Sequence, residues 1–212
     1  MISLTNIYES LVSEDYPQSF DMKFFKTLQS FASRKKYCDE HLKKIAQGSS
    51  RIVYFIDNEK VLKLAKNKKG LAQNETEINY SDDYMLTGIV APVYDYHENF
   101  LWLEMALAKK VKKSDFKRIT GIDFDDFGEV LTSADSAYRN KGLQFKVDQD
   151  LVEEVADNEF TSGVYDYIAN FDIPSGDMRR INSYGLIKVN GEEQLAIIDY
   201  GLTTDVFKNY YS

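Results

Sequence analysis

This sequence of 212 residues has little cysteine, little histidine and little proline, and it has no long apolar run. Its single cysteine, Cys38, excludes an internal disulfide, and one cysteine with two histidines gives too few soft ligands for a zinc site. No apolar run approaches the ~18 residues that a membrane span needs. Residues 1–16 contain acidic side chains where a signal peptide would have a basic cluster and then an apolar stretch. We therefore expect a soluble, cytoplasmic protein with no membrane partner.

Acidic side chains outnumber basic ones in this chain. The 26 basic and 34 acidic side chains give a net charge of −8, opposite in sign to a nucleic-acid-binding surface, so no nucleic-acid partner is expected. The three prolines form no linker, and the length suits one large domain or one domain cut into two lobes. Because 43% of the residues are apolar and 14% are aromatic, the chain can bury a packed core.

The front half alternates helical and strand-like patterns. Helices are predicted where apolar residues recur at three- and four-residue spacings or where Gly and Pro are missing, and strands where apolar runs end at turn residues. In chain order the patterns predict a helix, two strands, a second helix and two more strands, at residues 21–46, 51–56, 60–65, 71–80, 89–96 and 100–105.

The rear half is mainly helical. Helical patterns dominate residues 114–170. A final hairpin of strands 185–189 and 194–199 is predicted because Asn190-Gly191 is a strong turn signal. A small β-rich front and a helical rear predict an α+β fold with two lobes.

Three oxygen-bearing side chains follow one another in the rear half. Four residues separate Asp177 from Asn182, and Asp199 ends the apolar run of the hairpin, followed by Tyr200 and Gly201. Phosphoryl transfer needs metal ligands and a carboxylate facing the attacking hydroxyl, and Mg²⁺ prefers oxygen ligands. This set therefore predicts a phosphoryl-transfer site.

Two other groups of residues carry part of the same pattern. Asp135 and Asn140 are also separated by four residues, and Asp126-Phe127-Gly128 has the aspartate–aromatic–glycine order. No hairpin ending in an apolar-Asp-aromatic-Gly run follows Asp135, and the acidic stretch before Asp126 is not the pattern of a buried strand. Only the set of Asp177, Asn182 and Asp199 combines the chain order, the four-residue separation and the following hairpin.

That first set resembles the protein kinase-like superfamily. The catalytic loop of the superfamily has an Asp and an Asn separated by four residues, and its metal-binding Asp precedes an aromatic residue and a glycine. The resemblance spans roughly 45–205 and implies a protein-kinase-like bilobal fold. It implies one kinase-like domain over 1–212, with a helical extension, a β-rich N-lobe and a reduced helical C-lobe at 1–44, 45–106 and 107–212.

The front half resembles the same superfamily at the loop that covers the nucleotide. Gly48, Ser49 and Ser50 lead into a strand in which Val53 stands where the family has an apolar lid over the base. The resemblance implies that these four residues bind the nucleotide. The loop departs from the family in having one glycine where three are usual, which leaves its backbone contacts to phosphate open.

Lys63, in the apolar run 61–64, resembles the strand lysine that contacts the α- and β-phosphates. Glu77, fourteen residues later on the predicted helix, is its expected partner, with Glu75 as the alternative. Residues 101–106 resemble the strand and hinge that hold adenine through backbone groups, which places Glu104 and Ala106 beside the base.

Two departures from the family bear on function. Ser175-Gly176 precedes Asp177 where regulated eukaryotic kinases have His-Arg, so control by a phosphorylated activation loop is not expected. Because the sequence ends eleven residues after Gly201, the elements that dock peptide substrates are not expected. The chain is in these respects similar to compact kinase-like proteins of bacteria and their phages.

The resemblance implies an ATP-dependent phosphotransferase. Asn182 and Asp199 would bind Mg²⁺ or Mn²⁺. Asp177 would deprotonate the acceptor hydroxyl of a protein or small molecule, and Arg179 would stabilise charge on the transferred phosphoryl group. The alternative is a pseudokinase that binds nucleotide as a sensor or partner-binding protein without turnover, which the single-glycine loop and the short C-terminus favour. A purely structural α+β domain would bind no nucleotide.

Overall fold

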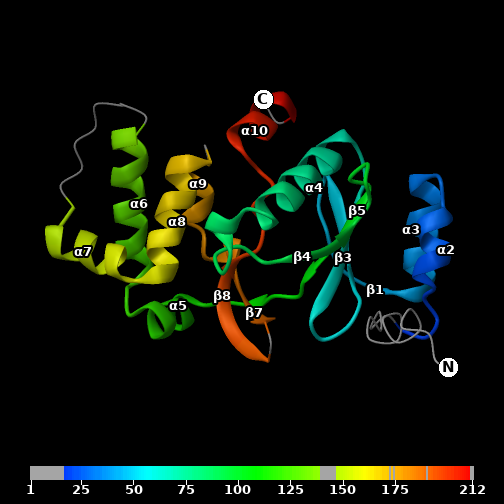
Figure 1. The fold of residues 1–212 in the computed structure, drawn as a ribbon, viewed down its shortest axis with the longest axis horizontal. Helices are drawn as coiled ribbons and strands as arrows, with labels where there is room; N and C mark the ends of the chain where they lie inside the picture. The colour runs from blue at the N-terminus through cyan, green and yellow to red at the C-terminus, as the bar shows by residue number, and fades with distance from the viewer. Residues whose placement is uncertain (1–16, 139–146, 172, 174, 190, 211–212) are drawn as a thin grey trace, which may run out of the picture.

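The computed structural model describes residues 17–138, 147–171, 173, 175–189 and 191–210. These residues form a five-stranded antiparallel sheet, a three-stranded antiparallel sheet and a set of helices, so the predicted α+β fold class is confirmed. The five-stranded sheet lies toward the end of the molecule that carries the N-terminal helices (Figure 1). The opposite end is helical, with α6 (Phe124–Tyr138), α7 (Gln149–Asp157) and α8 (Glu159–Asn170) packed together. The two lobes expected from the sequence are present.

The first described residues form two helices and a strand. Helix α2 (Met22–Thr27) is followed by helix α3 (Phe31–His41), which begins at a capping box on Ser30. Strand β1 (Lys43–Gln47) then pairs with the next strand. The single helix predicted over 21–46 is wrong, because a serine N-cap and sheet pairing outweigh the apolar spacing on which that prediction rested.

The five-stranded sheet has the order β1-β2-β3-β5-β4. The strands after β1 are β2 (Arg51–Phe55), β3 (Lys60–Ala65), β4 (Val93–Tyr96) and β5 (Trp102–Ala106). Strand β3 is central, and its alternate side chains face opposite ways. Leu62 and Leu64 pack with α2 and α3, whereas Val61 belongs to the cluster shared with Ile78 of α4 (Lys68–Ser81). Lys63 is therefore on the side of the sheet that α4 covers.

Helix α4 approaches the sheet closely at Gly70. The helix starts three residues before the predicted 71–80 because the Asn67 side chain accepts a hydrogen bond from the Gly70 amide. A Cβ at Gly70 would lie 2.3 Å from the Ser50 carbonyl oxygen and 3.0 Å from the Ala65 Cα. The absence of a side chain here therefore sets how near α4 lies to the loop before β2 and to β3.

Gly70→Ala is expected to lower the free energy of unfolding by about 1–3 kcal/mol, because the added methyl group meets backbone that cannot turn away. Gly128→Ala is the matched control. It is also a helical position, but its Cβ would make an ordinary contact 3.8 Å from Arg179 Cγ, so the change should stabilise by about 0.5–1 kcal/mol. Urea unfolding of both variants checks this, and equal gains in stability would contradict the close approach of α4.

Most of the remaining helices and strands follow the central sheet in the chain, whereas the first 3₁₀ turn lies between α4 and β4. The remaining elements are α5 (Lys113–Thr120), α9 (Ser175–Met178), α10 (Thr204–Tyr210), two 3₁₀ turns η1 (Tyr84–Leu86) and η2 (Ile181–Ser183), and strands β6 (Lys109–Lys110), β7 (Tyr184–Val189) and β8 (Glu192–Ile197). The predicted hairpin is present as β7 and β8, with Gly191 at φ 86° in its turn, whereas Asn190 lies outside the described residues. Aromatic side chains around Phe116 fill the core of the helical lobe. Within the described ranges no helix combines the length and apolar character needed to cross a membrane.

Candidate functional site

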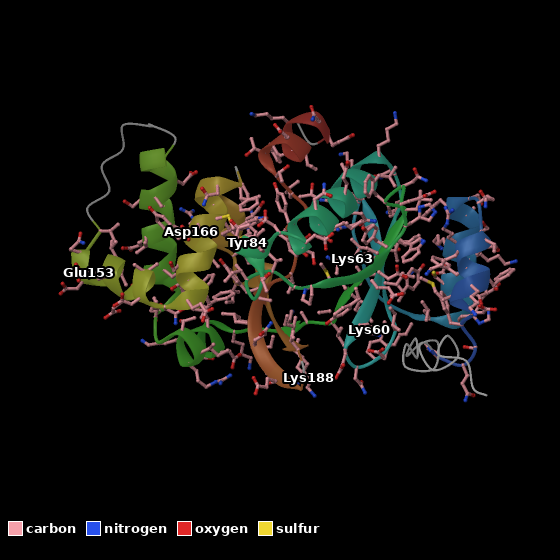
Figure 2. The ribbon with its side chains drawn as sticks, in the orientation of Figure 1. Lys60, Lys63, Tyr84, Glu153, Asp166 and Lys188 are labelled. Carbon is pink, nitrogen blue, oxygen red and sulfur yellow. The ribbon has the colours of Figure 1, made fainter. Side chains whose placement is uncertain are left out.

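A cleft of about 290 Å³ opens between the five-stranded sheet and the end of β8. Its apolar walls include Ile45, Ala46, Val53, Val61, Met105, Ala106, Leu107 and Ala108, and its polar residues are Arg51, Lys63, Asn182 and Asp199. Lys63 lies near the centre of the molecule, whereas Lys60 at the start of the same strand lies nearer its edge (Figure 2). The cleft brings together five of the predicted site residues, which are Val53, Lys63, Ala106, Asn182 and Asp199.

Lys63 and Glu77 form a buried ion pair beside this cleft. The Lys63 Nζ lies 3.1 Å from Oε1 and 3.0 Å from Oε2 of Glu77, and it also donates to the Ile198 carbonyl at 3.2 Å. The two side chains are 9% and 0% exposed. Burial lowers the pKa of the Lys63 ammonium, and the Glu77 carboxylate opposes this by raising it. The carboxylate that pairs with Lys63 is that of Glu77, the expected partner, whereas Glu75, the alternative, is exposed.

Arg51 joins this pair to Asp199 and is not among the site residues predicted from the sequence. Its Nη1 lies 2.7 Å from Glu77 Oε2, and its Nη2 lies 2.7 Å from Asp199 Oδ1. Only 9% of the Arg51 side chain is exposed. Side chains alternate along a strand, so Arg51 shares a face with Val53, and that two-residue period is the signal that could have placed it at the cleft.

Asn182 and Asp199 are the cleft residues that could hold a metal ion. The Asp199 side chain is 64% exposed just after β8, and Asn182 is exposed in η2. The part of the chain that the structure describes contains no group of three or more His, Cys, Asp or Glu suited to a metal. One carboxylate and one amide oxygen fit Mg²⁺, which commonly completes its octahedron with waters and substrate phosphate oxygens.

Tyr200 and Gly201 fix the segment that carries Asp199. The Tyr200 side chain is buried, and its hydroxyl donates to the Ala91 carbonyl at 2.7 Å. A Cβ on Gly201 would lie 2.6 Å from the Gln73 carbonyl oxygen of α4. The aromatic residue and the glycine thus hold Asp199 at a set position relative to α4.

Asp177 and Arg179 are not among the described residues that line the cleft. Asp177 lies in α9, with its Oδ1 3.2 Å from Arg180 Nη1 and its carbonyl accepting a 2.7 Å hydrogen bond from the Ser183 hydroxyl. Arg179 is exposed, and its Nη1 donates to the Thr132 hydroxyl of α6 at 2.6 Å. Arg179 lines a separate hollow of about 280 Å³ on α6. The catalytic roles of both residues stay predictions.

The loop before β2 is held by side chains of α4 and of the turn before it. The Ser50 hydroxyl donates to Gln73 Oε1 at 2.6 Å, and Asn67 Nδ2 donates to the Ser49 carbonyl at 3.1 Å. Gly48 is exposed, with space around its Cα for a side chain. The Ser50 hydroxyl is therefore bound to α4, and its contact with nucleotide stays a prediction.

Glu104 and Ala106 lie on β5. Glu104 is buried between Leu62 of β3 and Asp95 of β4 in the sheet register. Ala106 lines the cleft, and its amide donates to the Pro92 carbonyl at 3.0 Å. The structure thus places Ala106 at the cleft wall and Glu104 within the sheet.

The other motif candidates lie in helix α6. Phe127 is fully buried in the core of the helical lobe, and Asp126 is exposed on the same helix, so Asp126-Phe127-Gly128 is not the end of a strand. Asp135 is a buried residue of α6, and Asn140 lies outside the described residues. The strand-end context that favoured Asp199 over Asp126 is observed.

Comparison with protein-family models and with curated protein sequences found no match. Comparison with solved structures found similarity to the GDP and kanamycin complex of APH(2'')-IIia, with a TM-score of 0.38, 9% identity, and coverage of 76% of this chain and 66% of that chain. The streptomycin–ATP–APH(2'')-IIa ternary complex has a TM-score of 0.33, 12% identity, and coverage of 95% and 72%. The ADP-bound aminoglycoside phosphotransferase APH(2'')-Ib has a TM-score of 0.34, 10% identity, and coverage of 86% and 71%. Similarity of this size assigns no activity to the chain, so the functional argument rests on the cleft.

Proposed function

We propose that the protein is an ATP- and Mg²⁺-dependent phosphotransferase that transfers the γ-phosphoryl group of ATP to a hydroxyl group of a protein or small molecule. The observation that carries this proposal is the buried Lys63–Glu77 pair beside a cleft that also contains Asn182 and Asp199. Phosphoryl transfer is catalysed mainly by fixed charges and by positioning, and a lysine held by a buried carboxylate is such a charge. A cytoplasmic location and an origin in bacteria or their phages stay predictions from the sequence.

The cleft residues suit the parts of ATP in turn. The apolar walls near Val53 and Ala106 would hold the base, and Lys63 would contact the α- and β-phosphates. Asn182 and Asp199 would hold Mg²⁺, which neutralises phosphate charge when bound. The apolar walls and the oxygen-bearing side chains of the cleft therefore support the nucleotide and the metal that the proposal requires.

Two further residues would act on the acceptor side. Asp177 would orient the acceptor hydroxyl and accept its proton. Arg179 would stabilise charge on the transferred phosphoryl group, and for this its exposed side chain would have to leave Thr132. The loop 48–50 would cover the phosphates.

ATP with Mg²⁺ is expected to raise the melting temperature, because a ligand that binds only the folded state stabilises it by mass action. At ~100 times the dissociation constant the gain is about 2.7 kcal/mol, a shift of several degrees for a chain of this size. A fluorescence melting curve at millimolar ATP measures it. No shift with either Mg²⁺ or Mn²⁺ would count against every nucleotide-binding function for this cleft.

A second candidate function is a nucleotide-binding protein without turnover, acting as a sensor or on a partner. Two contacts favour it. Arg51 pairs with Asp199, the carboxylate that would bind the metal, and Arg179, which would act on the transferred phosphoryl group, is hydrogen-bonded to Thr132 on α6. Incubation with labelled ATP, Mg²⁺ or Mn²⁺ and a bacterial lysate separates the two candidates. Transfer of the label supports the enzyme, whereas ATP binding without transfer or hydrolysis supports the second candidate.

A further inference from the structure

We propose that Arg51 is a second phosphate-binding cation of the nucleotide site, acting beside Lys63. The inference rests on the proposed function, since it assumes that the cleft takes a nucleotide. It goes further by assigning a binding role to a residue outside the recognised motif positions.

Arg51 is placed to reach a bound phosphate chain. The guanidinium of Arg51 lies between the carboxylates of Glu77 and Asp199, with Nη1 2.7 Å from Glu77 Oε2 and Nη2 2.7 Å from Asp199 Oδ1. Glu77 is also the partner of Lys63, at 3.0 Å. A phosphate chain that contacts Lys63 and a metal ion held by Asp199 would therefore pass within reach of Arg51.

The loop that would cover the phosphates has donors that already form hydrogen bonds within the protein. The loop has a single glycine, and the Gly48 amide donates to the Arg51 carbonyl at 2.9 Å. The Ser50 hydroxyl donates to Gln73 at 2.6 Å. With these two donors engaged within the protein, more of the phosphate binding would fall to cleft side chains such as Arg51.

Metal binding would change the charge balance around Arg51. Two cations, Lys63 and Arg51, meet two carboxylates, Glu77 and Asp199, so the cluster is balanced. When a divalent ion takes Asp199, the other three residues keep an excess positive charge. A guanidinium offers paired donors that match phosphate oxygens better than an ammonium does. Arg51 would then turn from Asp199 to the phosphates.

The test is titration calorimetry with ATP in Mg²⁺, ATP in EDTA, and adenosine, on the parent and on Arg51→Met. In Mg²⁺ we expect Arg51→Met to bind ATP about 10–100-fold more weakly, the usual effect of losing hydrogen bonds to a charged group. In EDTA the loss should be smaller, because Asp199 still holds Arg51. Adenosine binding should change less than about twofold, because adenosine has no phosphate to contact Arg51. Arg118→Met is the matched control, since Arg118 is exposed on α5 and pairs only loosely, 3.7 Å from Asp115. It should bind all three ligands like the parent.

The outcomes separate the inference from the proposed function. A parent protein that binds neither ATP nor adenosine overturns both. A parent that binds ATP, with Arg51→Met binding it as tightly or more tightly, overturns the inference alone and makes Arg51 a structural tie between β2 and Asp199. If Arg51→Met does not fold, Arg51→Gln decides, because its amide can still form hydrogen bonds to the neighbouring carboxylates but carries no charge. Weaker ATP binding with unchanged adenosine binding then supports the inference, and unchanged ATP binding overturns it.

Discussion

Glu77→Ala is expected to lower the free energy of unfolding by about 3–5 kcal/mol, the usual cost of removing one partner from a buried ion pair. The Glu77 side chain is 0% exposed and lies 3.0 Å from Lys63 Nζ and 2.7 Å from Arg51 Nη1. Without it, two buried cations face each other with no carboxylate between them. Urea unfolding measures the loss. The rise in melting temperature with ATP and Mg²⁺ should also shrink, because the carboxylate no longer holds Lys63 in place.

Glu75→Ala is the matched control for this experiment. Glu75 lies on the same helix and is exposed, so its removal should change stability by less than about 0.5 kcal/mol. In Glu77→Ala the buried Lys63 can reduce the cost by losing its proton, because burial lowers its pKa. The folded variant then binds fewer protons than the unfolded chain, so its stability should rise with pH toward the ordinary lysine pKa of about 10.4. Equal unfolding midpoints for the parent and Glu77→Ala would contradict the buried pair.

Elements of the fold with strong local signals could be predicted from the sequence. Strand β3 begins and ends where predicted, at Lys60 and Ala65, and its two-residue period puts Lys63 on the side that α4 covers. The N-terminal helix could not be predicted correctly, because its apolar spacing continues across Ser30, where an N-cap starts a new helix. Whether β1 forms depends on β2 as its partner, which no local pattern reveals.

The sequence predicts which residues of the motifs belong to the candidate site, but it does not predict which side chains pair there. Lys63 and Glu77 are fourteen residues apart on adjacent elements, so motif spacing found them. Arg51 meets Asp199 across 148 positions of sequence, a contact that depends on how the lobes meet. Arg179 contacts Thr132 through the choice of one side-chain conformation, which spacing does not determine. Pairing across lobes and side-chain direction are therefore what the structure adds.

Asp177→Asn is expected to reduce phosphotransfer by about 10²–10⁴-fold, the usual contribution of a positioned general base. The amide keeps the size of the carboxylate but cannot accept the proton of the acceptor hydroxyl. The rise in melting temperature with ATP and Mg²⁺ should remain, since Asp177 is not among the described residues that line the cleft. Asp126→Asn is the matched control, because Asp126 is an exposed aspartate of α6, and its activity should stay within a few-fold of the parent. If Asp177→Asn keeps full activity while Lys63→Ala loses it, the cleft binds the nucleotide but another group deprotonates the acceptor. If neither change affects the biological effect of the protein while ATP still binds Asp177→Asn, that effect does not depend on catalysis, and the sensor without turnover is the correct function.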